Sequence, residues 1–162
     1  MLKTAKRICE LVNRYVEYFV AVLLAVATLS IFFQVFCRFM LNTGFAWTEE
    51  LARFLFVWIG MLGTSICVHR KANLGIETFI NMLSPDGRRR CWVLINGLAI
   101  VLFCFLVYYG AVILPVVSVQ ESPSLNISMA IPYSGVLFGA ILTLLHLVIQ
   151  LWDGMVNREE GQ

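Results

Sequence analysis

The sequence predicts an all-α membrane protein with four transmembrane helices. Of its 162 residues, 60% are hydrophobic and only 14% are charged, whereas soluble domains contain about 25% charged residues. The charges also separate four long uncharged stretches, which favours bilayer-spanning helices over short, alternating barrel strands. The whole chain, residues 1–162, is expected to form a single membrane domain. Its net charge of +2 is too small and scattered for a nucleic-acid-binding surface, so no nucleic-acid partner is expected.

The first two spans follow from the spacing of the charges. Residues 18–37 are twenty uncharged residues in a row, which as a helix cover about 30 Å, the thickness of the hydrocarbon core. The next uncharged run, 54–68, has 15 residues and is too short alone. The second span is therefore expected at about 49–68, with Thr48 as the N-cap and two glutamates in the first turn, where the helix dipole favours acidic residues.

Prolines shape the expected third and fourth spans. Thirty uncharged residues, 91–120, follow the basic loop, and Ser84-Pro85 upstream is typical of an N-cap with proline at the first helical position. We expect a long, tilted helix with its span at about 90–114 and an interruption near Pro115. Two further prolines occupy the beginning of the last uncharged stretch, so the fourth span is expected at about 132–152.

The distribution of Lys and Arg predicts the orientation. Cytoplasmic loops carry an excess of basic residues, and ten of the twelve in this chain share one side of the membrane when the N-terminus is inside. Only Arg38 and Arg53 fall on the other side. We therefore expect both termini and loop 69–90 in the cytoplasm, with loops 38–48 and 115–131 outside.

Two segments beside the spans allow further interpretations. Basic residues followed by an apolar run with Ala25-Val26-Ala27 are similar to a signal peptide, but the apolar run continues through Phe33, which favours a retained span. Residues 1–17 and 74–83 carry apolar residues at helical spacing with polar residues opposite. Both are expected to be short amphipathic helices on the inner membrane surface.

The spans lack the groups that pumps and enzymes require. No Asp, Glu, Lys or Arg occupies a span centre, whereas coupled transporters keep ionisable groups or broken helices near the bilayer midplane. The sequence has no GxxxxGK[ST] phosphate loop, and its five cysteines include no CxxC pair and are interpreted as packing residues. No catalytic residue, cofactor or metal site is expected, and the chain is not expected to be an enzyme.

Two histidines leave one cofactor alternative open. His69 ends the second span and His146 lies in the inner half of the fourth, so both are able to face the interior of one bundle and ligate a haem. The chain would then be a haem or quinone anchor of a respiratory complex. The simpler interpretation is a histidine at the headgroups and a second one that forms a hydrogen bond between helices.

Small residues on the spans indicate close helix packing. Gly135 and Gly139 share one face of the fourth span, and Gly60 and Thr64 share a face of the second. Such faces let membrane helices approach one another closely. They either hold the four helices of this chain together or receive a helix of another subunit, and the sequence leaves both interpretations open.

The most informative stretch runs from Arg38 to Gly63. Its Glu49 and Arg53 are i, i+4 neighbours on a helix, and Arg38 returns to the same membrane face. The stretch is either an ion-paired interfacial hairpin with Trp47 in the aromatic belt or a polar patch for a partner on the outer face. The candidate partner-interface residues are Arg38, Trp47, Glu49, Glu50, Arg53, Gly60, Gly135 and Gly139.

A series of spaced motifs adds a family resemblance that covers about residues 10–155. The motifs are Arg38-Phe39, Trp47-Thr48-Glu49-Glu50-Leu51-Ala52-Arg53, Val57-Trp58, Leu62-Gly63, the basic loop, and Ser122-Pro123-Ser124-Leu125 to Ile131-Pro132-Tyr133. In this order they resemble the small membrane subunit of tripartite ATP-independent periplasmic (TRAP) transporters, the DctQ-type permeases. Several spaced matches in one order are more specific than any single motif.

The resemblance implies a non-enzymatic subunit in the bacterial inner membrane, surrounded by membrane lipid. In such systems a soluble periplasmic binding protein captures an organic anion, such as a sialic acid or a four-carbon dicarboxylate. A much larger membrane subunit binds sodium ions and substrate and moves its transport domain like an elevator. The small subunit is bound to the scaffold of that large permease subunit, and its outer loops are a further candidate for docking the binding protein.

Two other classes compete with this interpretation. A small multidrug exporter also has four spans, but it needs an acidic residue in its first span, and residues 18–37 contain none. A pure scaffold without a transport partner fits the composition equally well, and only the family resemblance argues against it.

Overall fold

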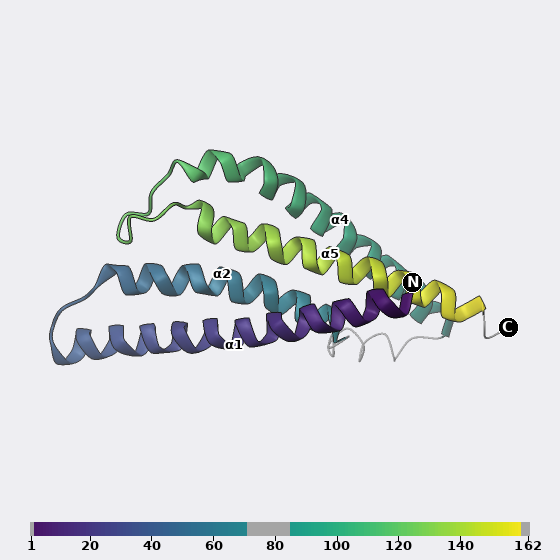
Figure 1. Ribbon diagram of the computed structural model, residues 1–162, viewed down its shortest axis with the longest axis horizontal. Coiled ribbons are helices and arrows are strands. Elements are labelled where there is room, and N and C mark those ends of the chain that lie inside the picture. The colour runs from purple at the N-terminus through teal and green to yellow at the C-terminus, as the bar shows by residue number, and fades with distance from the viewer. Residues whose placement is uncertain (1, 71–84, 160–162) are drawn as a thin grey trace.

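The computed structural model describes residues 2–70 and 85–159 (Figure 1). These residues form four long helices, α1 (Leu2–Met40), α2 (Ala46–His69), α4 (Pro85–Ser118) and α5 (Ala130–Glu159). Each helix contains a segment long and apolar enough to cross a membrane: Glu10–Met40, Ala46–His69, Arg90–Ser118 and Ala130–Trp152. The prediction of an all-α chain with four such helices is therefore confirmed for the described residues.

The helices form a row rather than a closed bundle. α2 packs against α1 and α5, and α5 packs against α4, so the order across the molecule is α1, α2, α5, α4 (Figure 1). The α1–α2 turn and the α4–α5 loop lie together at one end, which we call the loop end (Figure 1). The beginning of α1 and the end of α5 lie at the other, the terminal end. This arrangement fits termini on one side of a membrane, while the side itself stays a prediction.

The closest helix contact lies between α2 and α5. A Cβ atom at Gly139 would lie 2.6 Å from Cβ and 2.8 Å from the carbonyl carbon of Met61, and one at Gly135 would lie 2.8 Å from the ring of Trp58. Only glycine fits this approach, because any side chain would push the two backbones apart. The small-residue face of the fourth span thus holds this chain's own helices together.

Trp58 strengthens the same contact. Its Nε1–H donates a hydrogen bond to the carbonyl oxygen of Ile131 at the start of α5, over 3.1 Å. Its ring lies 6.2 Å from those of Phe19 on α1 and Phe138 on α5, measured between ring centroids. One side chain of α2 therefore links all three neighbouring helices in the row.

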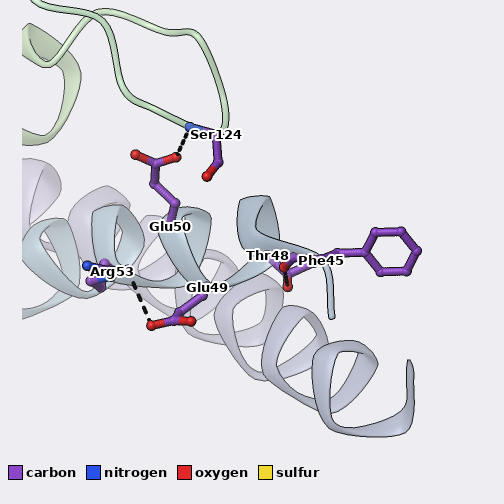
Figure 2. A network of polar contacts seen from close by, with 6 residues as sticks. All are labelled: Phe45, Thr48, Glu49, Glu50, Arg53 and Ser124. Carbon is purple, nitrogen blue, oxygen red and sulfur yellow. Dashed lines mark hydrogen bonds and ion pairs between the residues drawn. The ribbon is translucent and has the colours of Figure 1, made fainter. Parts of the chain in front are cut away.

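The start of α2 differs from the prediction. The helix begins at Ala46, and Phe45 is its N-cap without any side-chain capping bond. The hydroxyl of Thr48 donates to the carbonyl oxygen of Phe45 over 2.7 Å (Figure 2), whereas an N-cap hydroxyl would accept from a backbone N–H. The N-cap at Thr48 is therefore wrong, because this residue lies inside the first turn, where its side chain is completely buried.

The expected interruption at Pro115 is also wrong. α4 continues past this residue to Ser118, whose hydroxyl donates to the carbonyl oxygen of Pro115 over 2.7 Å. Proline removes one backbone donor, and this close to the helix end the remaining bonds still close the last turn.

The N-terminal region forms part of a longer helix than expected. α1 is continuous from Leu2 to Met40, so residues 2–17 are not separated from the first span. It ends in a turn where Leu41 and Thr43 donate backbone hydrogen bonds to the carbonyl oxygen of Cys37 and Asn42 takes a left-handed backbone conformation, as helix C-termini often require. The surface helix expected at 74–83 and the N-cap expected at Ser84 lie outside the described residues.

Candidate functional site

A buried carboxylate dominates the loop end. Glu50 lies in the first turn of α2 and is only 7% exposed. Its Oε2 accepts hydrogen bonds from the backbone N–H of Ser124 over 2.9 Å and of Leu125 over 3.1 Å, and Figure 2 shows the carboxylate pointing away from α2 towards this loop. Bonds to a charged acceptor are stronger than neutral ones. Glu50 therefore joins the start of α2 to the α4–α5 loop, 74 residues further along the chain.

The α4–α5 loop, residues 119–129, is a short hairpin. Glu121 and Ser128 form an isolated antiparallel bridge. Further backbone bonds run from Ser122 N to Ile127 O (2.9 Å), from Met129 N to Gln120 O (2.9 Å) and from Asn126 N to Ser122 O (3.1 Å). Asn126, at the tip, takes the left-handed conformation that asparagine tolerates better than most residues. The loop backbone is thus held both by its own bonds and by the carboxylate.

Three other candidate residues share the exposed face of α2. Arg53 Nη2 lies 3.3 Å from Glu49 Oε1, which confirms the predicted i, i+4 pair, and both side chains are more than half exposed. They point away from the side that carries Glu50 (Figure 2). Gly60 lies on the same face, seven residues after Arg53, and a Cβ there would meet open space. The exposed Glu49–Arg53 ion pair contributes at most about 1 kcal/mol to the stability of the folded chain.

The remaining candidates divide between surface and interior. Trp47 is 41% exposed and packs against Phe33 of α1, with ring centroids 6.4 Å apart. Arg38 is exposed in the last turn of α1, where a basic residue complements the helix dipole. Gly135 and Gly139 are in close contact with α2, as described above. The eight candidates therefore do not form one site: five lie on the surface and three are used inside the chain.

A second polar cluster, at the terminal end, was not predicted. Arg70, the C-cap of α2, donates from Nε and Nη2 to the two carboxylate oxygens of Glu17 on α1 over 2.9 and 2.6 Å. Hydrogen bonding to this carboxylate raises the pKa of Arg70, which stays charged. The side-chain amide of Asn13 donates to the same carboxylate over 2.6 Å. Glu17 and Arg70 flank the first two spans, so the predicted topology already placed both at one membrane face.

The two histidines meet in the same region. Their ring centroids lie 4.8 Å apart, and His146 Nδ1 forms a buried hydrogen bond with Ser65 Oγ over 3.1 Å. Two rings this close leave no room for a porphyrin plane between His69 and His146. The geometry favours the simpler interpretation, a polar contact between α2 and α5. Within residues 2–70 and 85–159, no group of three or more His, Cys, Asp or Glu side chains is placed to hold a metal ion.

Together, the fold and these contacts define a multi-pass membrane protein whose charged side chains join α2 to neighbouring segments near both ends of α2 and leave the span centres uncharged. The sequence places this protein within a specific class of transport subunits. Residues 27–157 match the model of the DctQ component of tripartite ATP-independent periplasmic transporters, and the chain belongs to this family. The family consists of transporter permease subunits, not of enzymes.

Individual relatives agree with this assignment. The chain is 31% identical over 108 residues to the sialic acid TRAP transporter small permease protein SiaQ of Vibrio cholerae, covering 67% of this chain and 59% of that protein. It is 26% identical over 105 residues to the C4-dicarboxylate TRAP transporter small permease protein DctQ of the same species, covering 65% and 45%. The chain thus spans about half the length of these two relatives.

A third relative shows a small permease segment inside a longer protein. The isethionate TRAP transporter permease protein DctMQ of Oleidesulfovibrio alaskensis is 27% identical over 95 residues, which cover 54% of this chain but only 14% of that protein. The matching segment is therefore a small part of a larger permease, as expected where TRAP small subunits pair with large permease subunits.

Proposed function

We propose that this chain is the small scaffold subunit of a sodium-coupled, binding-protein-dependent TRAP transporter, and that it braces the large elevator-type permease subunit. The family match over residues 27–157 carries this proposal. The uncharged span centres support it, because ion coupling and substrate recognition near the midplane require polar groups that the large subunit would supply. The respiratory haem anchor is not favoured by the family or by the histidine geometry.

The exposed face of α2 is the proposed contact with the large subunit. Large apolar side chains suit a lipid-facing surface, whereas small residues at mid-membrane suit a second helix. Gly60 has open space beside it, and the Glu49–Arg53 pair marks the end of the same face. A helix of the partner scaffold packed here would bury all three residues.

The substrate class follows from the relatives alone. Two small permeases similar to this chain serve a sialic acid and a C4-dicarboxylate transporter by name. We therefore assign organic acid uptake to the complex, with sialic acids and dicarboxylates as the first substrates to test. The residues that select the substrate would lie in the other two components.

The orientation completes the proposal. With the terminal end in the cytoplasm, as the Lys and Arg distribution predicts, the loop end faces the periplasm of a bacterial inner membrane. The α1–α2 turn and the α4–α5 loop would then form the outer surface available for docking the periplasmic solute-binding protein, while lipid surrounds the remaining helix faces.

Co-purification tests the subunit role. The affinity-tagged chain, extracted from bacterial membranes in mild detergent, should bring down a large multi-span permease, and uptake in proteoliposomes should require both subunits, the binding protein and a sodium gradient. Purification of the chain alone, with full uptake by the large subunit without it, would exclude the proposed role.

A matched pair of glycine variants tests the contact face. Gly60→Leu places a large side chain on the proposed face, whereas Gly97→Leu places the same side chain on α4, where a Cβ also meets open space. We expect the first variant to lose most of the bound permease and the second to retain it. Equal recovery with both variants would show that the partner does not bind at α2.

A further inference from the structure

The contact between α2 and α5 is made by residues other than Glu50. That contact already rests on the close approach at Gly135 and Gly139 and on the hydrogen bond from Trp58 to Ile131. Burying an ionised carboxylate is unfavourable unless hydrogen bonds compensate it, so this residue needs a separate explanation. Both of its hydrogen-bond partners belong to the tip of the loop, so Glu50 fixes the orientation of that tip.

The hairpin has an anchored side and a free side. Ser122 is 1% exposed, and the amides that follow Pro123 point towards the carboxylate. On the other side, Gln120, Glu121, Pro123 and Asn126 are exposed, and Val119 at the base is 84% exposed. A loop with a preorganised backbone binds a partner at a smaller entropic cost than a loop that must become ordered. An anchored hairpin with a polar free side suits a soluble partner.

We propose that Glu50 is a positioning residue that orients the hairpin 119–129 as the docking element for the soluble binding protein. This inference rests on the proposed function, in which the loop end faces the periplasm. It goes further by assigning docking to one of the two loops and by naming the side chain that sets its orientation. Glu50 itself makes no contact with the binding protein; it acts only through the backbone amides of Ser124 and Leu125.

Transport kinetics give the first readout. The complex of large and small subunits is reconstituted in proteoliposomes, and substrate-loaded binding protein is titrated at a fixed sodium gradient. Glu50→Ala should raise the half-saturating concentration of binding protein about tenfold, with the maximal rate kept within about twofold. Glu50→Gln should have a smaller effect, because its amide oxygen still accepts the two hydrogen bonds without the charge. Glu10→Ala, which removes an exposed carboxylate at the terminal end, is the matched control and should change neither value.

Hydrogen exchange of the same complexes gives a second readout that does not depend on transport. The amides of Ser124 and Leu125 should be protected in the wild type and in Glu10→Ala, and should lose protection in Glu50→Ala. Loss of protection together with a raised half-saturation supports the inference.

Each remaining outcome overturns the inference. Unchanged exchange would show that Glu50 does not hold the loop, and a released loop with unchanged uptake kinetics would show that the hairpin is not the docking element. Failure of both Glu50 variants to assemble with the large subunit would show a purely structural role. A wild-type complex whose uptake is indifferent to the binding protein would instead contradict the proposed function, which keeps the two failures apart.

Discussion

Replacing Gly139 by alanine tests the packing of the whole row. The added methyl would lie 2.6 Å from Cβ and 2.8 Å from the carbonyl carbon of Met61, about 0.8 and 0.6 Å short of the 3.4 Å at which ordinary contacts begin. Neither atom belongs to the flexible end of a side chain, so α2 and α5 must separate. Overpacking of this kind costs about 1–3 kcal/mol.

The measurement is thermal unfolding of the purified full-length chain in detergent, followed by tryptophan fluorescence. A loss of 1–3 kcal/mol corresponds to a fall in apparent Tm of about 2–12 °C for a chain of this size. Because Trp58 packs at the same contact, its emission should also shift as the helices separate.

Three further glycines provide the comparison. Alanine at Gly60 or Gly97 meets open space and should leave the apparent Tm within about 2 °C, as for most surface substitutions. The apparent Tm of Gly135→Ala should lie between that of Gly139→Ala and that of the two open positions. Its methyl would lie 2.8 Å from the ring of Trp58, and a ring is able to tilt away. If Gly139→Ala had the same apparent Tm as Gly60→Ala, the close approach of α2 and α5 would be refuted.

Four other predictions concern polar contacts and the histidines. A double-mutant cycle of Glu17→Gln and Arg70→Ala should give only a small coupling in equilibrium unfolding, because Arg70 is exposed and water screens the pair; a coupling as large as the cost of either single variant would contradict this. Ser65→Ala should cost about 0.6 kcal/mol through the lost bond to His146, and an unchanged apparent Tm would count against that bond. Trp58→Phe keeps an aromatic ring but removes the Nε1 donor, so a loss of about 0.5–1.5 kcal/mol is expected in the same assay; a larger loss would implicate the size of the indole. The purified chain should show no Soret band in its visible spectrum, and such a band would restore the haem-anchor interpretation.

The positions of the helices were predictable because charges are costly inside a bilayer. The uncharged run 18–37 could only be a span, and it lies within the apolar segment of α1. The ends of the helices were less predictable, because they depend on local backbone bonds. Threonine is a residue type that often forms an N-cap, yet the hydroxyl of Thr48 donates to the carbonyl oxygen of Phe45. The helix begins two residues earlier, at Ala46, and the residue type alone does not reveal that start.

The roles of individual candidate residues depended on contacts distant in sequence. The sequence pattern placed Glu50 in the first turn of a helix. It could not show the hydrogen-bond partners of Glu50, because these lie 74 and 75 residues further along the chain. Likewise, the glycines of the second and fourth spans look alike in sequence, although Gly139 meets Met61 and Gly60 meets open space. Helical periodicity shows which residues share a face; it does not show which neighbour covers that face.

The row arrangement gives a physical reason why such a chain would need a partner. In a closed bundle each helix contacts two others and the group encloses an interior, whereas here α1 packs mainly on α2, and α4 mainly on α5. Over residues 2–70 and 85–159 the row therefore offers two broad faces and encloses no interior shared by all four helices. Charged contacts join α2 to neighbouring segments near both of its ends, to the α4–α5 loop at Glu50 and to α1 at the Glu17–Arg70 pair. This arrangement leaves one side of α2 open at Gly60, which suits the proposed role of the chain as a brace beside the large subunit.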